Sequence, residues 1–295
     1  MKFSLFPNNT SLNGKSVMLA YENALKNAGE QVVHNDMDAD VAVIWSVLFQ
    51  GRMAQNEQVW NHFRKNNKPV IVLEVGGVKR NITWRAGING ITGDAYHGPT
   101  GNPQDRFDAF KLKIAPWCDT KIGNIIICGQ HDDSAQWRTH SDQSVAGWIY
   151  NTVESWRVHD TESTIIIRPH PRNIFKWESL GSVDRLGWTN LQDPKKIDGT
   201  YDDFDFNNAL KNAKLVINYN SNPAIEAVLS GVPIMTHESS RCWPVANQIG
   251  YTENIKKPDR QQWANDLCYQ EWTESELSLG EPFRRIRPKL EELVG

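Results

Sequence analysis

Residues 163–173 read STIIIRPHPRN, a short apolar run that ends abruptly in a rigid, cationic corner. Three consecutive isoleucines are typical of a strand that is buried on both faces of a parallel sheet. Proline restricts the backbone angle φ, so Pro169 and Pro171 end the strand and fix the direction of His170 between them. The stretch therefore predicts an α/β protein in which charged residues follow an inner strand.

Helix-like and strand-like segments alternate on both sides of this stretch. Apolar residues at helical spacing predict helices over 16–29, 56–67 and 141–159, the last with Ser141 as its cap. Strands are expected over 40–48, 68–77 and 124–130, and a short helix followed by a strand is expected within 206–221 and again within 222–236. This order is typical of βαβ units with a parallel sheet, so each half is Rossmann-like in pattern, although neither carries GxGxxG.

The length of 295 residues is typical of two domains. We expect a first domain over 1–118, a second over 119–278, and a C-terminal amphipathic helix over 279–295 that Pro288 interrupts. The net charge is only −3, which excludes a general binder of polyanions. The four cysteines form no CxxC pair, so neither a zinc site nor a disulfide framework is indicated. The sequence predicts no signal peptide and no membrane span, which favours a cytoplasmic enzyme.

Polar residues gather where four strands of the second half are expected to end. In open α/β sheets, ligands bind beyond the carboxyl ends of the strands. The stretches at these ends are GQHDDS (129–134), RPHPR (168–172), NYNSNPAIEA (218–227) and HESS (237–240). If the strands are parallel, all four stretches meet at one edge of the sheet.

These stretches hold groups that suit an anionic ligand with a ribose. Arg168 and His170 offer donors to an anion, and Ser221 and Asn222 stand where a helix begins, which favours phosphate. Glu226, in the first turn of that helix, could accept hydrogen bonds from a ribose diol. A loop corner at Pro169–Pro171 and an ordinary helix cap at Asn222 are the structural alternatives.

Three of these stretches resemble motifs of a known family. GQHDDS, RPHPR and NSNPAIEAVLSGVPIMT (220–236) are similar to the GQxxDxS, RPHP and SxxxxEAxxxGxPV motifs of capsule-polysaccharide glycosyltransferases, the Kdo-transferase and sialyltransferase-like enzymes. The resemblance spans residues 124–236. It implies a GT-B fold, in which two Rossmann-like domains face each other across a cleft and a terminal helix often crosses back to the first domain.

The same resemblance implies a nucleotide-sugar donor, a UDP- or CMP-sugar, as co-substrate, with no metal and no other cofactor. It assigns phosphate binding to His170, Ser221 and Asn222, and nucleotide or sugar contacts to Gln130, Asp133 and Glu226. The expected donor-binding residues are Gln130, Asp133, Ser134, Arg168, His170, Arg172, Ser221, Asn222 and Glu226. Relatives often have two hydroxyl residues in a row where this chain has Ser221-Asn222-Pro223, which leaves the choice between UDP and CMP open.

The first half resembles glycosyltransferases encoded by tailed bacteriophages and marine viruses, over residues 36–53 and 68–97. That resemblance implies a hydroxylated pyrimidine base in phage-type DNA as the acceptor, and the host cytoplasm as the location. The stretch DMDAD (36–40) precedes a strand and is interpreted as a turn rather than a metal site.

The acceptor side is expected in EVGGVKRNITWRAGINGITGDAYH (74–97), whose five glycines predict a mobile functional loop. An acceptor hydroxyl needs a general base, for which Asp94 is the first candidate, then Glu74, with His97 as the third. Lys79, Arg80, Trp84 and Arg85 are expected to bind acceptor phosphate and to stack a base. A solvated basic face and a capped turn are the structural alternatives.

Other functions remain open from the sequence. The acceptor could be a capsule or lipopolysaccharide glycan instead of DNA. A nucleotide-sugar epimerase shares the GT-B fold and would turn over its donor without an acceptor. A non-catalytic nucleotide-binding protein would bind nucleotide and be indifferent to loss of Asp94 or Glu74. The sugar, the stereochemical outcome and the oligomeric state are not predicted.

Overall fold

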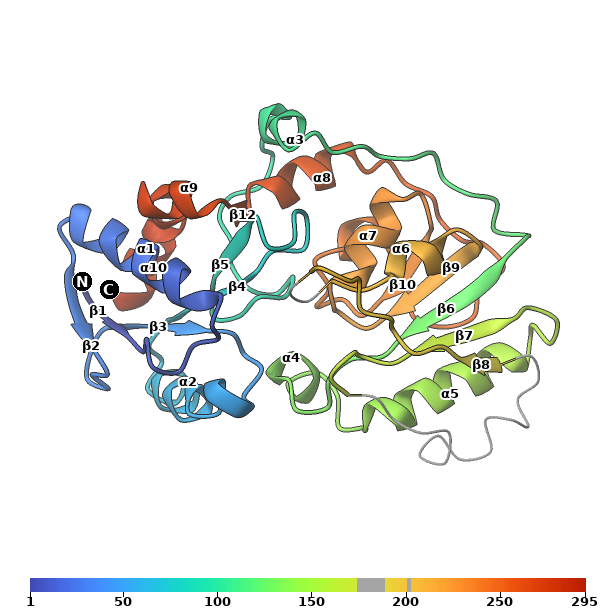
Figure 1. The fold of residues 1–295 in the computed structure, drawn as a ribbon, viewed down its shortest axis with the longest axis horizontal. Coiled ribbons are helices and arrows are strands. Elements are labelled where there is room, and N and C mark those ends of the chain that lie inside the picture. The colour runs from blue at the N-terminus through green and yellow to red at the C-terminus, as the bar shows by residue number, and fades with distance from the viewer. Residues whose placement is uncertain (174–188, 201–202) are drawn as a thin grey trace. The chain divides into compact units, whose positions relative to one another are not determined.

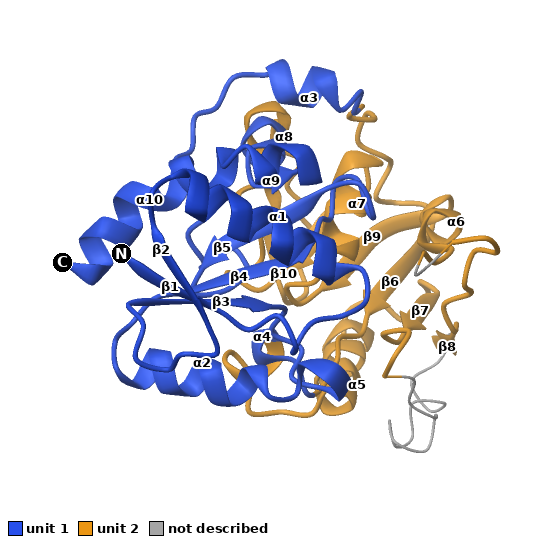
Figure 2. Cartoon of the chain, turned by 60° about the vertical axis from the view of Figure 1, so that its left-hand side comes forward, with its two compact units in different colours: residues 1–112, 133–136, 264–295 blue, residues 113–132, 137–263 orange. Residues whose placement is uncertain are grey.

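The computed structural model describes residues 1–173, 189–200 and 203–295. The chain forms two compact units, each with its own sheet (Figure 2). Unit 1 comprises residues 1–112, 133–136 and 264–295, and unit 2 comprises residues 113–132 and 137–263. The chain thus returns to unit 1 at Ala264, before the C-terminal helix begins. No helix in the described residues is both long and apolar enough to span a membrane.

Unit 1 is built on a six-stranded sheet in the order β12-β5-β4-β3-β1-β2 (Figure 1). Four strands are parallel to one another, namely β1 (Lys2–Leu5), β2 (Gln31–His34), β3 (Val41–Trp45) and β4 (Val70–Val75). Two more are added at one edge: β5 (Trp84–Ile88) pairs antiparallel with β4, and β12 (Glu271–Trp272) pairs antiparallel with β5. The helices are α1 (Gly14–Asn27), the short 3-10 helix η1 (Gly51–Met53), α2 (Asn56–Lys65), α3 (Asp105–Ala109), α9 (Glu274–Ser278) and α10 (Glu281–Val294).

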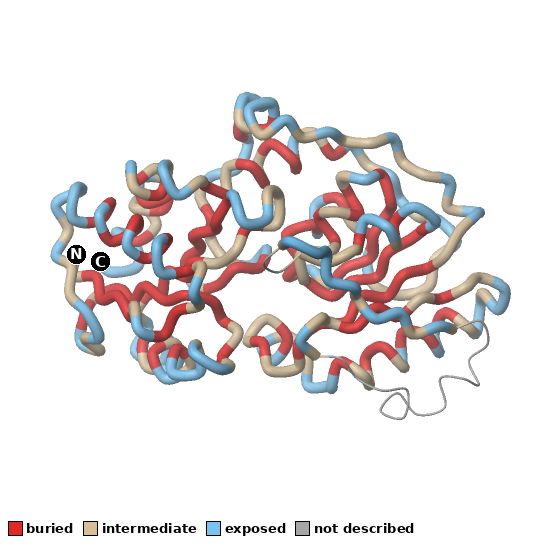
Figure 3. The backbone as a smooth tube through the Cα atoms, in the orientation of Figure 1, coloured by how far each residue is buried: buried red, intermediate tan, exposed pale blue. Residues whose placement is uncertain are grey.

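The sheet of unit 1 is buried on both faces because its strands alternate between two cores. Val41 and Val43 of β3 pack with residues of α1 and α10, whereas Ala42 and Ile44 pack with Phe63 of α2. This is the period of two that a strand imposes on successive side chains. Figure 3 shows the central strands of both units as buried backbone.

Unit 2 has a six-stranded sheet in the order β11-β10-β9-β6-β7-β8, with every neighbouring pair parallel. Its strands are β6 (Asn124–Cys128), β7 (Ile165–Arg168), β8 (Thr189–Leu191), β9 (Ala213–Asn218), β10 (Ile234–Thr236) and β11 (Asn247–Gln248). Its helical elements are α5 (Val145–Arg157), α6 (Phe206–Leu210), α7 (Pro223–Leu229) and the 3-10 helix η4 (Trp243–Val245), while α4 (Ala135–Arg138) and α8 (Gln261–Cys268) lie where the chain passes between the units. The predicted α/β class with two Rossmann-like sheets is confirmed.

The isoleucines of the opening stretch form the inner strand that the sequence predicts. Ile165 and Ile167 of β7 pair in register with Ile125 and Ile127 of β6. All four side chains are buried in one core, which α5 covers through residues such as Val153. Branched apolar side chains fit this pleated, doubly covered surface.

Three local predictions were wrong. The cap of the helix predicted over 141–159 is Ser144, whose hydroxyl accepts a hydrogen bond of 3.1 Å from Gly147 N–H, and not Ser141. The stretch 74–97 is not one loop, because β5 lies inside it. Pro288 does not interrupt the last helix, since α10 continues through it to Val294 with the proline on its exposed side. The expected turn at 36–40 is confirmed between β2 and β3.

Candidate functional site

The four polar stretches of unit 2 follow β6, β7, β9 and β10, which are neighbours in the sheet (Figure 1). Because these strands are parallel, their carboxyl ends meet at one edge, as the sequence predicts. The chain leaves β6 toward β7 and β8, and then returns to the other side of β6 with β9. The strand order therefore reverses between β6 and β9, the place where open α/β sheets bind ligands.

Side chains from three of these strand ends are joined by hydrogen bonds. Gln130, after β6, donates from Nε2 to Oδ1 of Asn220, after β9, at 2.7 Å. Asn220 donates from Nδ2 to Oγ of Ser239, after β10, at 2.9 Å. All three side chains are buried. The strand ends are thus fixed to one another by polar groups that are out of contact with bulk water.

The proline corner after β7 is fixed to the loop after β6. Gly129 N–H donates to the carbonyl oxygen of Arg168 at 2.7 Å, and a Cβ on Gly129 would lie 3.2 Å from Cα of Pro169. Asn173 donates from Nδ2 to the Asp132 carboxylate at 2.8 Å and to the Gln130 carbonyl oxygen at 3.2 Å. These hydrogen bonds therefore hold the loops after β6 and β7 together.

His170 lies in the loop after β7, and one of its ring nitrogens accepts a hydrogen bond. The main-chain N–H of Arg172 donates to Nδ1 of His170 at 3.2 Å. An amide N–H can only donate, so Nδ1 carries a lone pair and the neutral ring has its proton on Nε2. The ring meets His131 edge to face, with the ring centres 5.5 Å apart. His170 is therefore a hydrogen-bond donor through Nε2. The exposed side chain of Arg172 follows it at the same corner.

Arg168 turns into the protein, in contrast to the predicted contact with an anionic ligand. Its side chain is only 4% exposed and donates to the Asp205 carboxylate at 2.6 Å and to Oε1 of Gln192 at 2.9 Å. Burial would raise the pKa of Asp205, but hydrogen bonds from Lys195 N–H and from Arg168 lower it below its ordinary value. This ion pair holds the end of β7 to the segment before α6.

Ser221 and Asn222 lie at the start of α7, directly after β9. Asn218 fixes Ser221 twice, because its Oδ1 accepts from Ser221 N–H at 3.0 Å and its Nδ2 donates to Ser221 Oγ at 2.7 Å. Asn222 is the N-cap residue, and Glu226 is half-buried in the first turn. Arg168, the last residue of β7, is buried. The other predicted residues of unit 2 follow parallel strands whose carboxyl ends share one edge of the sheet, namely Gln130, His170, Arg172, Ser221, Asn222 and Glu226.

Asp133 and Ser134 group with unit 1 instead. Ser134 forms a β-bridge with Leu48, and Gln50 donates a hydrogen bond from its amide to the Asp133 carboxylate. The neighbouring Ala135 N–H donates to Val47 O at 3.0 Å. These contacts anchor the segment 133–136 on the loop after β3.

Two of the four residues predicted for the acceptor, Trp84 and Arg85, have structural contacts instead. Trp84 is buried in the core and packs on Trp45, with the ring centres 5.9 Å apart. Arg85 is 3% exposed and donates to the carbonyl oxygens of Val75 at 3.1 Å and Ile91 at 3.0 Å. Neither side chain is placed to stack a base or meet a phosphate. Lys79 is half-buried and Arg80 is exposed, both in the turn between β4 and β5.

The three candidate bases lie in different surroundings. His97 is buried, with Nδ1 3.3 Å from the Ala86 carbonyl oxygen and Nε2 3.0 Å from that of Thr92, so neither nitrogen faces a substrate. Asp94 is exposed and accepts a hydrogen bond from the Thr92 hydroxyl. Glu74 is half-buried near the end of β4, and its carboxylate accepts from Val75 N–H at 2.8 Å.

Glu271 in β12 holds the glycine-rich turn of unit 1, a role that the sequence did not reveal. Its fully buried carboxylate accepts hydrogen bonds from Gly77 N–H at 2.7 Å, Val78 N–H at 2.8 Å and the Thr83 hydroxyl at 2.8 Å. A Cβ on Gly76 would lie 2.5 Å from Oε2 of Glu271. The absence of a side chain at Gly76 therefore lets the turn close around a carboxylate that lies 194 residues from Gly77 along the chain.

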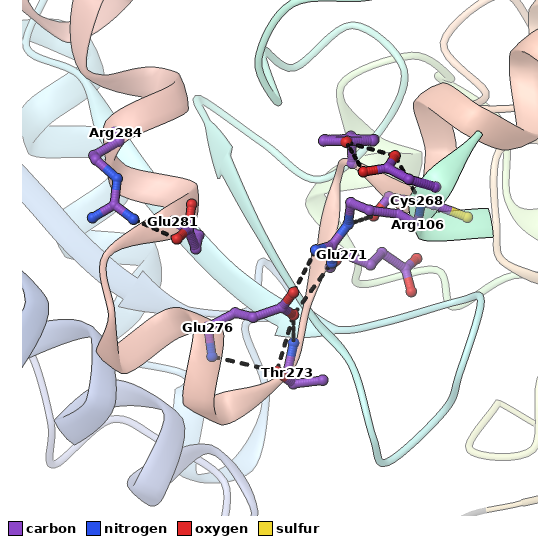
Figure 4. Close-up of polar contacts among 9 residues, drawn as sticks. Arg106, Cys268, Glu271, Thr273, Glu276, Glu281 and Arg284 are labelled. Atoms are coloured by element: carbon purple, nitrogen blue, oxygen red, sulfur yellow. Dashed lines mark hydrogen bonds and ion pairs between the residues drawn. The ribbon is translucent and has the colours of Figure 1, made fainter. Parts of the chain in front are cut away.

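Arg106 joins α3 to the C-terminal part of unit 1 (Figure 4). It donates to the carbonyl oxygens of Cys268 at 3.0 Å and Glu271 at 2.7 Å, and it pairs with the carboxylate of Glu276. Its guanidinium also lies over the Trp272 ring, 4.3 Å from the centre. The cluster borders a pocket of about 350 Å³ within unit 1, lined by Asp105, Arg106, Tyr269, Trp272, Glu276, Leu279, Glu281 and Arg285. Among the described residues, no group of three His, Cys, Asp or Glu side chains is placed to hold a metal ion.

The chain is similar to known proteins in sequence and in fold. Residues 109–262 match the family of capsule polysaccharide biosynthesis proteins. Among solved structures, the KpsC β-Kdo 2,7 transferase of Thermosulfurimonas dismutans superposes with a TM-score of 0.54 at 16% identity, covering 98% of this chain and 100% of that one. The KpsC β-Kdo 2,4 transferase of the same organism superposes with a TM-score of 0.52 at 11% identity, covering 100% of this chain and 98% of that one. No curated protein sequence matches the chain.

At these identities the superpositions establish the fold, and they confirm the predicted GT-B class. The resemblance to capsule-polysaccharide glycosyltransferases is confirmed by the family match, whereas the resemblance of the first half to phage enzymes stays a prediction. The match covers more than half of the chain, which therefore belongs to the capsule polysaccharide biosynthesis protein family as a glycosyltransferase of the GT-B fold.

Proposed function

We propose that this chain transfers a sugar from a nucleotide-sugar donor to a hydroxyl group of a capsule-type glycan, with the donor held at the carboxyl edge of the sheet of unit 2. The observation that carries the proposal is the hydrogen bond between Gln130 and Asn220, which joins the two loops where the strand order reverses. Polar residues from all four neighbouring strand ends surround this point.

The donor-binding role of each residue follows from the hydrogen bonds that its side chain already makes. His170 donates from Nε2 to a phosphate oxygen, because Nδ1 is occupied by Arg172 N–H. Ser221 and Asn222 offer polar groups beside it, and Glu226 accepts from the ribose diol. Arg168 acts through structure, since Asp205 and Gln192 hold its guanidinium. Asp133 and Ser134, which follow the Gln130 strand end, contact the nucleotide or sugar, and Arg172 supplies a cation for the phosphates.

The reaction breaks the bond between the anomeric carbon of the sugar and the phosphate oxygen and forms one between that carbon and the acceptor oxygen. The phosphate leaves with the electron pair, and hydrogen-bond donors such as His170 stabilise its charge. The acceptor proton passes to a base, for which Asp94 stays the first candidate and Glu74 the second. The buried ring of His97 is not included, because both nitrogens face backbone carbonyls. No metal is assigned a role, in line with the family resemblance.

A capsule-type glycan is the first acceptor because the family match concerns capsule polysaccharide biosynthesis. A hydroxylated pyrimidine base in phage-type DNA, the acceptor predicted from the sequence, is the second candidate, supported by the exposed Arg80 and the half-buried Lys79. Trp84 and Arg85 do not support it, since both are buried. Binding to DNA should weaken steeply as salt rises, because phosphate contacts release counterions, whereas binding to a glycan should not.

A thermal-shift panel with CMP, UDP, GDP, ADP and double-stranded DNA, at low and moderate salt, tests the donor site first. A ligand at about 100 times its Kd adds about 2.7 kcal/mol of stability. Each kcal/mol raises the Tm of a domain of this size by about 2–4 °C. We expect a selective shift with one pyrimidine nucleotide, which then selects the sugars for an activity assay. No shift with any nucleotide would contradict the proposed donor site, and donor turnover without an acceptor would indicate an epimerase.

A further inference from the structure

The pocket of unit 1 that Arg106 borders has a second arginine in its lining, Arg285 of α10. We call this cavity of about 350 Å³ the unit 1 pocket. Arg106 pairs with the carboxylate of Glu276. Arg285 donates instead to two neutral oxygens, Asn102 Oδ1 at 2.7 Å and the Pro99 carbonyl oxygen at 3.2 Å. These hydrogen bonds hold the Arg285 side chain in place but do not offset its positive charge.

Arg285 also keeps hydrogen-bonding capacity that the described protein atoms do not use. Its Nε is buried and has no hydrogen-bond partner within residues 1–173, 189–200 and 203–295. Burial lowers the pKa of Arg285, and the positive charge of Arg106 acts in the same direction. A partly buried charge without a compensating partner costs free energy. These observations favour an anion beside the Arg285 guanidinium.

Tyr269 joins Arg285 to a carboxylate that also lines the unit 1 pocket. The guanidinium of Arg285 lies over the Tyr269 ring, 4.7 Å from its centre. The hydroxyl of the same ring donates to the two carboxylate oxygens of Asp105, at 2.7 and 2.9 Å. A carboxylate has about four lone-pair sites, so Asp105 can accept further hydrogen bonds from a ligand. One aromatic ring therefore holds both a cation and a hydrogen-bond acceptor of the pocket.

The other two carboxylates that line the pocket are paired with arginines (Figure 4). Glu276 pairs with Arg106, and Glu281 pairs with Arg284. A carboxylate that is paired with a guanidinium repels a second anion less than an isolated one does. A ligand anion is therefore attracted to Arg285 without strong repulsion from these two side chains.

The size and the polar groups of the unit 1 pocket fit a single acidic sugar. Sites for small molecules have volumes of about 300–1,000 Å³. A cavity of about 350 Å³ therefore suits one small ring rather than a chain of them. A carboxylate on such a ring can form two parallel hydrogen bonds with a guanidinium, and its hydroxyl groups are donors for Asp105. An inorganic anion would leave most of this volume unused.

We propose that the unit 1 pocket binds one carboxylate-bearing sugar of the acceptor glycan, with the carboxylate on Arg285 and hydroxyl groups on Asp105; this rests on the proposed function, which supplies a glycan as the acceptor. The pocket then contributes to the choice of acceptor, because a neutral glycan cannot use the charge of Arg285. Acidic glycans are thus the chemical class of acceptor that the chain prefers.

A nuclear magnetic resonance titration of the full chain with glucuronate, glucose and inorganic phosphate tests the proposal. The indole N–H signal of Trp272, which lines the pocket, reports binding, and it is identified as the signal absent from Trp272→Phe. Glucuronate should bind at least about tenfold more tightly than glucose, the preference expected for a hydrogen bond to a charged group. Arg285→Gln should remove this preference, whereas Arg285→Lys, which keeps the charge, should retain part of it.

Arg287→Gln is the matched control. Arg287 belongs to the same helix and carries the same charge, but it pairs with Glu30 and Glu291 and is not part of the pocket lining. The control should keep the wild-type preference for glucuronate, and the signals of the other tryptophans verify that each variant is folded. Equal binding of glucuronate and glucose, binding of phosphate alone, or an unchanged preference in Arg285→Gln would each overturn the proposal.

A titration with nucleotides distinguishes failure of this site from failure of the donor site. A wild type that binds nucleotide but shows no preference for glucuronate would overturn the acidic-sugar site and leave the donor site intact. A wild type that prefers glucuronate but binds no nucleotide would support the acidic-sugar site and contradict the donor site. A wild type that does neither would overturn both.

Discussion

Gln130 and Asn220 are 90 residues apart in the chain, yet the amide of Gln130 donates a hydrogen bond of 2.7 Å to the side-chain oxygen of Asn220. The two residues follow β6 and β9, between which the strand order of the sheet reverses. Polar side chains buried at such a point are costly unless they are hydrogen-bonded to one another. Their pairing shows that this edge of unit 2 is built around polar groups, which suits a hydrophilic ligand.

His170→Ala and Ser221→Ala should each weaken nucleotide binding about tenfold or more while the protein stays folded. The reason is the loss of a hydrogen bond to a charged phosphate, worth about 1.5–3 kcal/mol. His170→Gln should retain more affinity than His170→Ala, since it can still donate. Calorimetric titration measures the affinities, and circular dichroism verifies the fold. Wild-type affinity in both alanine variants would contradict the phosphate assignment.

Arg168 and Arg172 should give opposite results although both are arginines of one corner. Arg168→Met leaves the Asp205 carboxylate without its buried cation, and this should lower the free energy of unfolding by about 3 kcal/mol. Arg172→Met removes an exposed side chain and should leave stability nearly unchanged, but it should weaken nucleotide binding. Urea unfolding and nucleotide titration of both variants measure the two effects. Equal loss of stability in both would show that burial does not separate the two arginines.

Residues 163–173 illustrate what could be predicted from the sequence and what could not. The isoleucines of β6 and β7 identify inner strands, because short runs of branched apolar residues are typical of strands that are buried on both faces. Arg168, at the end of β7, was predicted to contact an anionic ligand. In the structure it pairs with Asp205, which lies 37 residues further along the chain, and no local sequence pattern links the two residues. The meeting of the polar stretches at one edge of the sheet was therefore predictable from the strand ends, whereas the burial of Arg168 against Asp205 was not.

The stretch 74–97 illustrates the opposite error. The sequence of β5 is WRAGI, which contains a glycine and an arginine and lacks the apolar–polar alternation of a half-buried strand. The five glycines of residues 74–97 therefore led to the prediction of a loop. The strand is stable because the Arg85 side chain donates hydrogen bonds to backbone carbonyl oxygens, and because β12, which is only two residues long, pairs with its outer edge. Both are contacts in three dimensions, and β12 lies near the other end of the chain.

Glu271→Gln should destabilise unit 1 by about 1–3 kcal/mol, because a carboxamide turns one N–H toward the backbone donors that the carboxylate now accepts. Gly76→Ala should act on the same turn, since its Cβ would lie 2.4 Å from the Thr83 hydroxyl. Gly147→Ala is the control, because Gly147 lies in α5 and its Cβ would meet only the Ser144 hydroxyl, at 3.2 Å. Thermal unfolding compares them. A control that destabilises as much as Gly76→Ala would sink the steric explanation.

Acid should weaken unit 1 through Glu276. Burial by itself would raise the pKa of this carboxyl, but the Arg106 guanidinium and the backbone N–H of Thr273 lower it below the ordinary value of 4.5 (Figure 4). A carboxyl with a lowered pKa in the folded state contributes stability above pH 4.5, and that contribution disappears as the pH falls through the lowered value.

Glu276→Gln removes this titration and keeps the size of the side chain. The wild type should therefore unfold at a higher temperature than the variant at pH 6, and the difference between them should shrink as the pH falls from about 5 to about 3. Taking the difference at each pH cancels the other carboxyl groups, which titrate in both proteins. Glu292→Gln is the control, because Glu292 is exposed and pairs with Lys289 on the surface of α10, where ion pairs contribute little. A gap that stays constant over the whole pH range would mean that the pair of Arg106 and Glu276 does not stabilise unit 1 through the charge of Glu276.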